Sequence, residues 1–294
     1  MINQGQDWTL VQGDCIEELA SMPDDTADLS VYSPPFSSLF TYSASERDIG
    51  NCANQEEFLE HLGFLIRELL RVTKPGRLSC CHISQVTSTK AMHGVIGLID
   101  LRGAVTSAFV ANGWIYHGDV CIDKDPQAQA IRTHSKALLF VQLRKDSSWL
   151  RPALADYILV FRKPGENALP IHPDLTNNEW IEWARPIWCG IDETDTLNTA
   201  VAKENDDERH ICPLQLGTIE RCIRLWSNPG ELVLSPFAGI GSEGYEAIRL
   251  GRRFYGIELK ESYAVTAVRN LKVAAALQTQ GGLFTVEGTV ACEM

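Results

Sequence analysis

The segment from Leu232 to Glu258 limits the fold of this chain more than any other part of the sequence. Residues 232–234 predict an apolar strand that runs into the turn SPFAGIG (235–241), a helix follows, and residues 254–257 predict a second strand. A strand, a helix and a strand in this order form a βαβ unit, in which both strands lie parallel in one sheet. The sequence therefore predicts an α/β fold.

Strands and helices alternate near the start of the chain as well. Residues 8–12 and 27–32 predict two strands with a short helix between them. Apolar residues at three-and-four spacing over 56–71 predict an amphipathic helix, and residues 78–83 predict the strand that follows it. Because two prolines cannot continue a central strand, the strand over 27–32 ends at the tetrapeptide SPPF (33–36).

The middle of the chain is less regular. Residues 113–120, 137–143 and 157–162 predict further strands. Residues 165–210 are rich in Pro, Asn, Asp and Glu, and we interpret them as a loop-rich insertion in which at least two of its three tryptophans form a small satellite core. The predicted architecture is a mostly parallel sheet with helices on both faces and one small insertion.

Charge is distributed unevenly along the chain. The formal net charge of −12 argues against a protein that coats nucleic acid non-specifically, because that binding depends on many Lys and Arg contacts to phosphates. Residues 121–165, however, hold eight Lys or Arg and four Asp, a local balance of +4. This basic segment is either part of a DNA-binding face or a solvated surface hairpin.

The sequence shows no sign of a metal site or a membrane span. Its nine cysteines are scattered without a Cys-x-x-Cys pair, which predicts reduced thiols that mostly serve as packing residues. The first residues do not resemble a signal peptide, and no stretch approaches about eighteen consecutive apolar residues. We therefore expect a cytoplasmic protein without a metal ion and without a membrane span.

The turn SPFAGIG has the residues of a ligand cradle. Gly239 and Gly241 allow backbone N–H groups to approach a ligand closely, and Glu258, at the end of the next strand, is placed to hold ribose hydroxyls. Together with Gly244 the two glycines also fit the spacing of a dinucleotide-binding turn. A tight turn without any ligand remains a further alternative.

The tetrapeptide SPPF suits a specific reaction. An amino group on a nucleobase is a poor nucleophile, and it becomes reactive when acceptors draw its hydrogens out of conjugation beside an electrophilic methyl group. Ser33 Oγ and the Pro34 carbonyl are acceptors of this kind, and Pro35 stiffens the turn. Phe36 offers a face on which the base stacks. The alternative interpretation is a buried proline turn with an aromatic plug.

With SPPF near its start and FAGIG near its end, the chain resembles the beta class of DNA amino-methyltransferases, in which the catalytic half precedes the cofactor half. Further matches follow in order, namely Gly13-Asp14-Cys15, residues 28–31, 71–76, 157–164 and 212–215, and Gly256-Ile257-Glu258 with Tyr263. The resemblance implies the Rossmann-like fold of SAM-dependent methyltransferases. It also implies a catalytic half over 1–164, a target-recognition insertion over 165–210 and a cofactor-binding half over 211–294.

The cofactor implied by the resemblance is S-adenosylmethionine. The residues assigned to it are Asp14, Pro213, Leu214, Ser235, Phe237, Ala238, Gly239, Gly241 and Glu258. In this assignment Glu258 holds the ribose and Asp14 lies near the adenine, although Asp14 is equally well explained as a plain helix cap. The family usually has Asp in place of Ser235, so one polar contact to the cofactor is missing unless another acid compensates.

The first residue of SPPF bears on the substrate. Relatives with Ser there usually methylate cytosine N4, and those with Asp or Asn usually methylate adenine N6, so Ser33 favours N4 of cytosine in double-stranded DNA. Methylation of cytosine C5 is disfavoured, because it needs a Pro-Cys nucleophile and this chain has Cys212-Pro213 in the reverse order. The target base has to rotate out of the duplex, and the methyl group then passes to it directly.

Contacts to DNA phosphates are expected from five basic residues, Arg132, Lys136, Arg144, Lys145 and Arg151. His82, at the end of its predicted strand, is interpreted as a structural histidine near the cleft. Three alternatives stay open: methylation of adenine N6, methylation of RNA or a protein amide, and a non-catalytic DNA-binding module, which Ser235 makes conceivable. A second copy of the chain and a restriction nuclease are further partners that the resemblance leaves open.

Overall fold

A nine-stranded mixed sheet in the order β1-β2-β11-β10-β3-β4-β8-β7-β9 organises the chain in the computed structural model, which describes residues 1–35, 50, 52, 54–88, 90, 94–197 and 213–286. The strands of this sheet are β1 (Ile2–Gln4), β2 (Trp8–Gln12), β3 (Ala27–Tyr32), β4 (Thr73–Ser84), β7 (Ile115–Ile122), β8 (Asp156–Arg162), β9 (Ile187–Trp188), β10 (Leu232–Ser235) and β11 (Arg253–Glu258). A separate two-stranded ribbon consists of β5 (Val86–Ser88) and β6 (Gly97–Ile99).

The centre of the sheet is parallel. β2, β11, β10, β3 and β4 run in one direction, whereas β8 is antiparallel to both β4 and β7. β1 adds an antiparallel edge, and β9 pairs in parallel with β7 at the other edge. The predicted α/β fold with a mostly parallel sheet is therefore confirmed.

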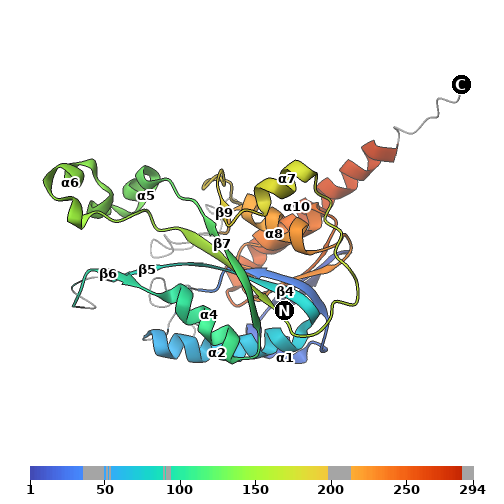
Figure 1. The fold of residues 1–294 in the computed structure, drawn as a ribbon. Coiled ribbons are helices and arrows are strands. Elements are labelled where there is room, and N and C mark those ends of the chain that lie inside the picture. The colour runs from blue at the N-terminus through green and yellow to red at the C-terminus, as the bar shows by residue number, and fades with distance from the viewer. Residues whose placement is uncertain are drawn as a thin grey trace, which may run out of the picture.

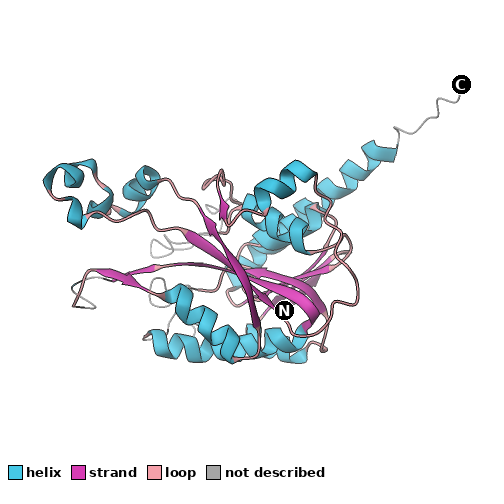
Figure 2. Cartoon of the chain, in the orientation of Figure 1, coloured by secondary structure: helices cyan, strands magenta, loops and turns pink. Residues whose placement is uncertain are grey.

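Helices cover both faces of the sheet, as predicted (Figures 1 and 2). One layer contains α1 (Cys15–Ser21), α2 (Gln55–Val72) and α4 (Leu101–Ala111), and the other contains α8 (Leu216–Trp226), α9 (Ser242–Arg249) and α10 (Glu261–Val286). Side chains alternate between the two resulting cores along β8: Ile158 and Val160 face one, and Leu159 and Phe161 face the other.

The two halves of the sheet join where β3 lies beside β10. The backbone N–H of Leu232 donates to Oδ2 of Asp28 at 2.9 Å, across a sequence separation of 204 residues. Arg77 forms a buried ion pair with Glu231 nearby. Strands from the two ends of the chain therefore meet in the middle of the sheet.

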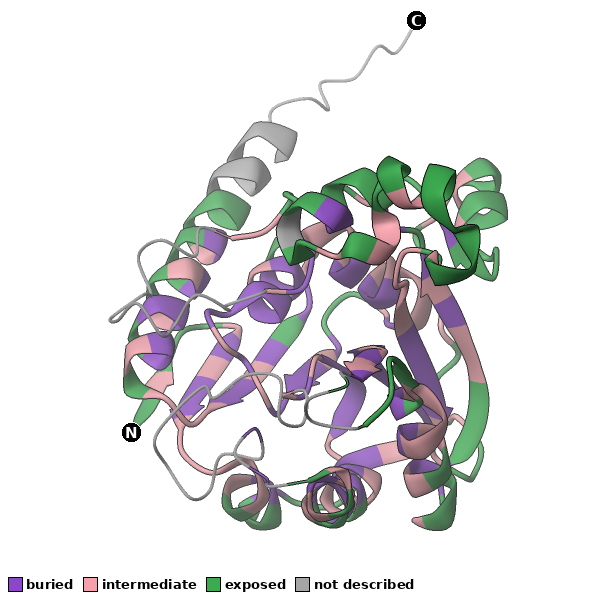
Figure 3. Ribbon diagram, turned by 90° about the vertical axis from the view of Figure 1, so that its left-hand side faces the viewer, coloured by how far each residue is buried: buried purple, intermediate pink, exposed green. Residues whose placement is uncertain are grey.

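The predicted strand over 137–143 is wrong. Residues 125–155, called here the helical arm, form four short helices instead, α5 (Pro126–Thr133), η2 (Lys136–Leu138), α6 (Phe140–Lys145) and η3 (Ser147–Trp149). β8 occupies the place beside β7, so residues 137–143 have no neighbouring strand to join. The basic segment 121–165 begins in β7 and includes its antiparallel partner β8, with the helical arm between the two strands. The arm projects from the sheet and is mainly exposed, in contrast to the buried central strands (Figures 1 and 3).

The base of the helical arm is fixed by one side chain. The amide of Gln129 donates to the carbonyl of Leu154 at 2.9 Å and accepts from its N–H at 2.8 Å. Gln129 is buried, whereas Phe140 and Trp149 further along the arm are 68% and 60% exposed. The arm is therefore anchored at its base and open toward its tip.

The segment 165–197 of the predicted insertion contains α7 (Asn177–Trp183) and β9 among loops. Its tryptophans do not form the satellite core that we expected. Trp188 is fully buried in the main core and stacks on Trp226 at a centroid distance of 6.4 Å, whereas Trp180 is 56% exposed. Because β9 pairs with β7, Trp188 reaches the core that the sheet already provides.

Candidate active site

A cleft of about 1180 Å³ lies at the carboxyl ends of the central strands. β10 and β3 lie side by side, and the chain leaves them in opposite directions, from β10 to its neighbour β11 and from β3 to its neighbour β4. Such a switch point leaves a crevice in which open α/β sheets bind ligands. The helical arm and the ribbon of β5 and β6 extend the walls of this cleft.

Most of the predicted site residues come together in this cleft. Those that line it are Asp14, Ser33, Pro34, Pro35, Lys136, Arg151, Pro213, Leu214, Phe237, Ala238, Gly239 and Glu258. Ser235 is buried at the end of β10, and Gly241 lies at the N-cap of α9. Arg144 and Lys145 lie on α6. Phe36 falls outside the described residues, as does the side chain of Arg132.

The glycine turn is held by Glu258. The Glu258 carboxylate accepts hydrogen bonds from the N–H groups of Gly239 and Lys260, both at 2.8 Å. Gly239 has a φ of +51°, and a Cβ added there would meet no heavy atom within 4 Å, so the turn borders open space. Gly241 has a φ of +86°. Both positions have the left-handed backbone that favours glycine.

Asp14 caps helix α1, which is one of the two roles predicted for it. Its Oδ1 accepts from the N–H groups of Ile16 at 2.9 Å and Glu17 at 3.3 Å, at the start of α1. The backbone N–H of the preceding Gly13 donates to the carbonyl of Glu258 at 3.0 Å. Asp14 therefore lies next to the glycine turn, where it lines the cleft as well as capping a helix.

Several buried oxygens near the glycine turn have no hydrogen-bond partner among the described residues. They are Ser235 Oγ, Ser242 Oγ and Gln215 Oε1. Ser242 and Gln215 line the cleft. An unsatisfied buried polar group costs about 1–3 kcal/mol, so these oxygens fit a site that gains polar partners when a ligand binds.

Glu243 is an acid at this site that the sequence analysis did not single out. It lies in the first turn of α9, is 4% exposed and lines the cleft. Burial raises the pKa of the Glu243 carboxyl to about 8, and the charge of Glu258 contributes to the increase. An acid at the start of a helix is common for helix-dipole reasons alone, so the sequence offered no signal. Glu243 is a candidate for the acid that compensates for Ser235.

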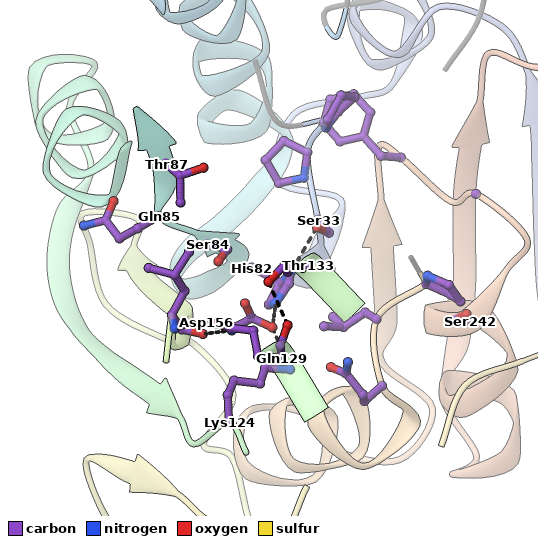
Figure 4. Close-up of a pocket in the computed structure, with 18 of the residues that line it drawn as sticks. Ser33, His82, Ser84, Gln85, Thr87, Lys124, Gln129, Thr133, Asp156 and Ser242 are labelled. Atoms are coloured by element: carbon purple, nitrogen blue, oxygen red, sulfur yellow. Dashed lines mark hydrogen bonds and ion pairs between the residues drawn. The ribbon is translucent and has the colours of Figure 1, made fainter. Parts of the chain in front are cut away.

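The other end of the cleft contains four polar side chains in contact, the Ser33 network (Figure 4). Ser33 Oγ lies 3.0 Å from Nδ1 of His82, and His82 Nε2 lies 3.4 Å from Oδ2 of Asp156. The same carboxylate oxygen lies 2.8 Å from Nζ of Lys124. Ser33 follows β3, His82 lies on β4, Asp156 begins β8 and Lys124 follows β7, so each residue comes from a different part of the sheet.

The Asp156 carboxylate is the charged centre of this network. Burial acts to raise the pKa of Asp156, but its interactions with His82, led by a hydrogen bond, and with Lys124 outweigh it and hold this pKa well below its usual range. Asp156 therefore stays ionised, and its Oδ2 contacts both His82 and Lys124.

The interpretation of His82 as a structural histidine was incomplete, and Lys124 and Asp156 were missed. One signal was available, because Ser33 follows one predicted strand and His82 lies near the end of the next, and consecutive strands usually lie side by side in a βαβ fold. The contact with Asp156 depends on the antiparallel register in which Ser84 lies opposite Asp156, and no local pattern indicates that register.

Cys15 also lines the cleft. Burial raises the pKa of the Cys15 thiol well above its ordinary value, with a further increase from the charge of Asp14. The thiol therefore stays protonated, which does not suit a nucleophile. Among the described residues, no cluster of three or more His, Cys, Asp or Glu is arranged to hold a metal ion. Within the same residues, no helix combines the length and the apolar character needed to cross a membrane.

Comparison with known protein families gives one clear match. The model of the N6/N4 DNA methylase family matches residues 27–269. The type II methyltransferase M.BglI of Bacillus subtilis is 29% identical over 176 residues, which are 59% of this chain and 44% of that protein. The DNA adenine methyltransferase YhdJ of Escherichia coli K12 is 41% identical over 68 residues, 23% of each chain. The matches thus span less than half of the length of these relatives.

Solved structures of similar fold cover nearly the whole chain. A DNA modification methylase from Thermus thermophilus, solved in complex with S-adenosyl-L-methionine, is 25% identical, with a TM-score of 0.69 over 90% of this chain and 93% of that one. The cytosine-N4-specific PvuII DNA methyltransferase is 18% identical, with a TM-score of 0.65 over 94% of this chain and 93% of that one. The second likeness concerns the fold alone.

Proposed function

Because the chain belongs to the N6/N4 DNA methylase family, we propose that it transfers a methyl group from S-adenosylmethionine to an exocyclic amine of a base in duplex DNA, and that this amine is N4 of cytosine. One observation carries the proposal: the turn of Ser33, Pro34 and Pro35 and the glycine turn at Gly239 line the same cleft. The acceptors for the amine and the cradle for a methyl donor therefore share one space.

The choice of cytosine rests on Ser33. The names of the relatives point both ways, since one is a DNA adenine methyltransferase and another structure is cytosine-N4-specific. Ser at the first position of the tetrapeptide favours cytosine. Adenine N6 is the second candidate, because the same acceptor geometry serves both amines.

The glycine-turn end of the cleft fits S-adenosylmethionine. Glu258 and Asp14 offer carboxylates, Gly239 borders open space, and Ser242 Oγ and Gln215 Oε1 are buried without partners among the described residues. In the proposed complex Glu258 holds the ribose hydroxyls, Asp14 lies near the adenine, and Pro213 and Leu214 close over the cofactor. When bound, S-adenosylmethionine supplies an electrophilic methyl group on a positively charged sulfur.

The rest of the reaction is carried out by residues of this chain. The base leaves the duplex and enters the cleft, whose volume of about 1180 Å³ exceeds that of a typical ligand pocket, about 300–1,000 Å³. Ser33 Oγ and the Pro34 carbonyl accept the two amine hydrogens, which directs the nitrogen lone pair toward the methyl group. Transfer is direct, without a covalent intermediate on the enzyme.

We place the DNA along the helical arm. Lys136 and Arg151 line the cleft, and Arg144 and Lys145 lie on α6 of the same arm. Phosphate contacts from these residues would hold the duplex so that an extruded base reaches Ser33. In this scheme residues 1–164 form the catalytic half, 165–210 the target-recognition insertion and 211–294 the cofactor half. A DNA substrate also agrees with the expected cytoplasmic location.

The test is to express the protein in a bacterial host that lacks its own DNA methylation and to map modified bases in the host DNA by single-molecule sequencing. N4-methylcytosine at one sequence motif is the expected result, and it identifies the recognition site. N6-methyladenine would overturn the assignment to cytosine alone. An absence of modified bases, with folded protein that transfers methyl groups to RNA or protein in vitro, would overturn the DNA substrate.

A further inference from the structure

We propose that His82 is a positioning residue for Ser33, which makes the Ser33 hydroxyl an acceptor toward the target amine and takes up the proton that the amine releases. This inference rests on the proposed methyltransferase function. It is carried by the Ser33 network, in which His82 stands between Ser33 at 3.0 Å and Asp156 at 3.4 Å.

The position of Asp156, 3.4 Å from Nε2, decides which nitrogen of His82 carries hydrogen. A carboxylate accepts hydrogen bonds and donates none, so a neutral His82 places its hydrogen on Nε2, which faces Asp156. Nδ1 then carries a free lone pair and accepts the hydroxyl hydrogen of Ser33. With its only hydrogen engaged, Ser33 Oγ presents lone pairs to any other partner. The amine of the base is such a partner.

Lys124 shares the Asp156 carboxylate with His82. Among the described residues, the charged groups beside the imidazole are Asp156 from β8 and Lys124 from the segment after β7. A lone buried carboxylate would favour the charged imidazolium. Nζ of Lys124 lies 2.8 Å from the same carboxylate oxygen and balances its charge. The side chains of Lys124 and Asp156 are only 2% and 16% exposed, so solvent screens this balance little.

The backbone holds the network in place before any substrate binds. His82 lies on β4, which pairs with β3 on one side and with β8 on the other, and His82 is opposite Ile158 of β8. Its side chain is 10% exposed. Positions fixed on adjacent strands supply the precision that orientation of a reacting group requires.

In the proposed step, His82 is the final acceptor of the proton that the base releases. The nitrogen lone pair of the base forms the new N–C bond, and the electrons of the broken C–S bond remain on sulfur. The nitrogen now carries one hydrogen too many. That proton passes to Ser33 Oγ, while the hydroxyl proton of Ser33 passes to Nδ1 of His82, and the resulting imidazolium is held by Asp156.

The first experiment compares wild type with His82→Asn in single-turnover methylation across pH. Asn keeps a polar group near the position of Nδ1 but cannot take up a proton, so we expect a rate about 10²-fold lower, the usual effect of losing a general base. Binding of S-adenosylmethionine, measured by calorimetry, stays within about twofold in a folded variant. The wild-type rate falls with a slope of one in acid, as His82 becomes protonated, and this acid limb is absent from His82→Asn.

His117→Asn is the matched control, because His117 lies exposed on β7 of the same sheet, with β8 between β7 and β4. This variant keeps both the rate and the acid limb of wild type. A His82→Asn enzyme with a rate within about threefold of wild type and an unchanged acid limb would overturn the role of His82. Methylation by wild type itself decides the proposed function separately, since an inactive wild type contradicts that function and not the positioning role alone.

A double-mutant cycle and a spectrum test the connection through Ser33. If His82 acts through Ser33, His82→Asn costs nothing further in a Ser33→Ala background, whereas a purely structural histidine gives additive losses. Without cofactor or DNA, ¹⁵N-labelled histidine resonances should show hydrogen on Nε2 of His82 and an unprotonated Nδ1. Additive losses or hydrogen on Nδ1 would contradict the proposal.

Discussion

The two ends of the cleft are built in different ways. The glycine-turn end is built mainly around one contiguous segment, residues 235–260, in which backbone N–H groups and the Glu258 carboxylate set the shape, and Asp14 and Gln215 join it from elsewhere in the chain. The Ser33 end is assembled from residues on four separate segments, and side-chain contacts hold it together. A contiguous turn is suited to a cofactor that many enzymes share, whereas a dispersed network can be adjusted for one reaction.

The largest expected effect tests whether the Ser33 end affects the rate of methyl transfer without affecting cofactor binding. Ser33→Ala removes one of two acceptors for the amine and should lower the single-turnover rate by roughly 10³-fold, similar to the loss of one stabilising hydrogen bond in other transition states. Calorimetry should show unchanged binding of S-adenosylmethionine, because among the described residues the Ser33 side chain contacts His82 and no contact with the glycine turn is seen. A large loss of cofactor affinity would mean that the two ends are not separate.

The next effect concerns the buried acid at the glycine-turn end. Burial raises the pKa of Glu243 to about 8 from 4.5, so the folded protein keeps a proton that the unfolded chain releases. The stability that this provides is complete below pH 4.5 and is lost as pH rises through 8. Glu243→Gln avoids that loss, so its free energy of unfolding without cofactor should exceed the wild-type value by on the order of 3 kcal/mol at pH 9.

Denaturant titrations at pH 4.5 and pH 9 measure this difference. Glu261→Gln is the control, because Glu261 is an exposed acid in the first turn of the neighbouring helix α10. The control should show the wild-type pH dependence. An equal gain in both variants would show that Glu243 is ionised in the folded protein.

Two glycine substitutions distinguish the effect of the glycine turn on stability from its effect on cofactor binding. In Gly241→Ala the new Cβ would lie 3.1 Å from Cβ of Ala267 at a φ of +86°, so we expect a loss of about 2 kcal/mol in unfolding free energy. In Gly239→Ala the new methyl group enters open space, which should cost about 1 kcal/mol of stability but weaken cofactor binding about 10-fold. Thermal unfolding and calorimetry on both variants check this, and equal effects would contradict it.

The smallest effects are expected on the helical arm. Replacing Lys136, Arg144 or Lys145 by Ala should each raise KM for DNA about threefold, reduce the salt slope of binding by about one and leave kcat unchanged. Lys272→Ala, on the exposed side of α10, is the control. A fall in kcat for Lys136→Ala would mean that the arm contributes to the Ser33 end directly.

The difference between the two ends also explains what the sequence could predict. The strands around SPPF and the glycine turn were predicted correctly, because each depends on a pattern of a few adjacent residues. The contact between His82 and Asp156 depends on the register of β4 and β8. Residues 137–143 were predicted as a strand because they are apolar, but they are exposed on the helical arm, where no sheet edge is available.

The place of β10 in the sheet has a consequence for protein synthesis. The ribosome makes β3 long before β10, since Asp28 and its partner Leu232 are 204 residues apart. At about 5–20 residues per second, roughly 10–40 s pass before the partner strand exists. During that interval the edge of β3 that pairs with β10 stays unpaired in the nascent chain, open to association with other nascent chains. Rapid dilution or a chaperone on the ribosome should therefore raise the yield of soluble protein more than any single stabilising substitution.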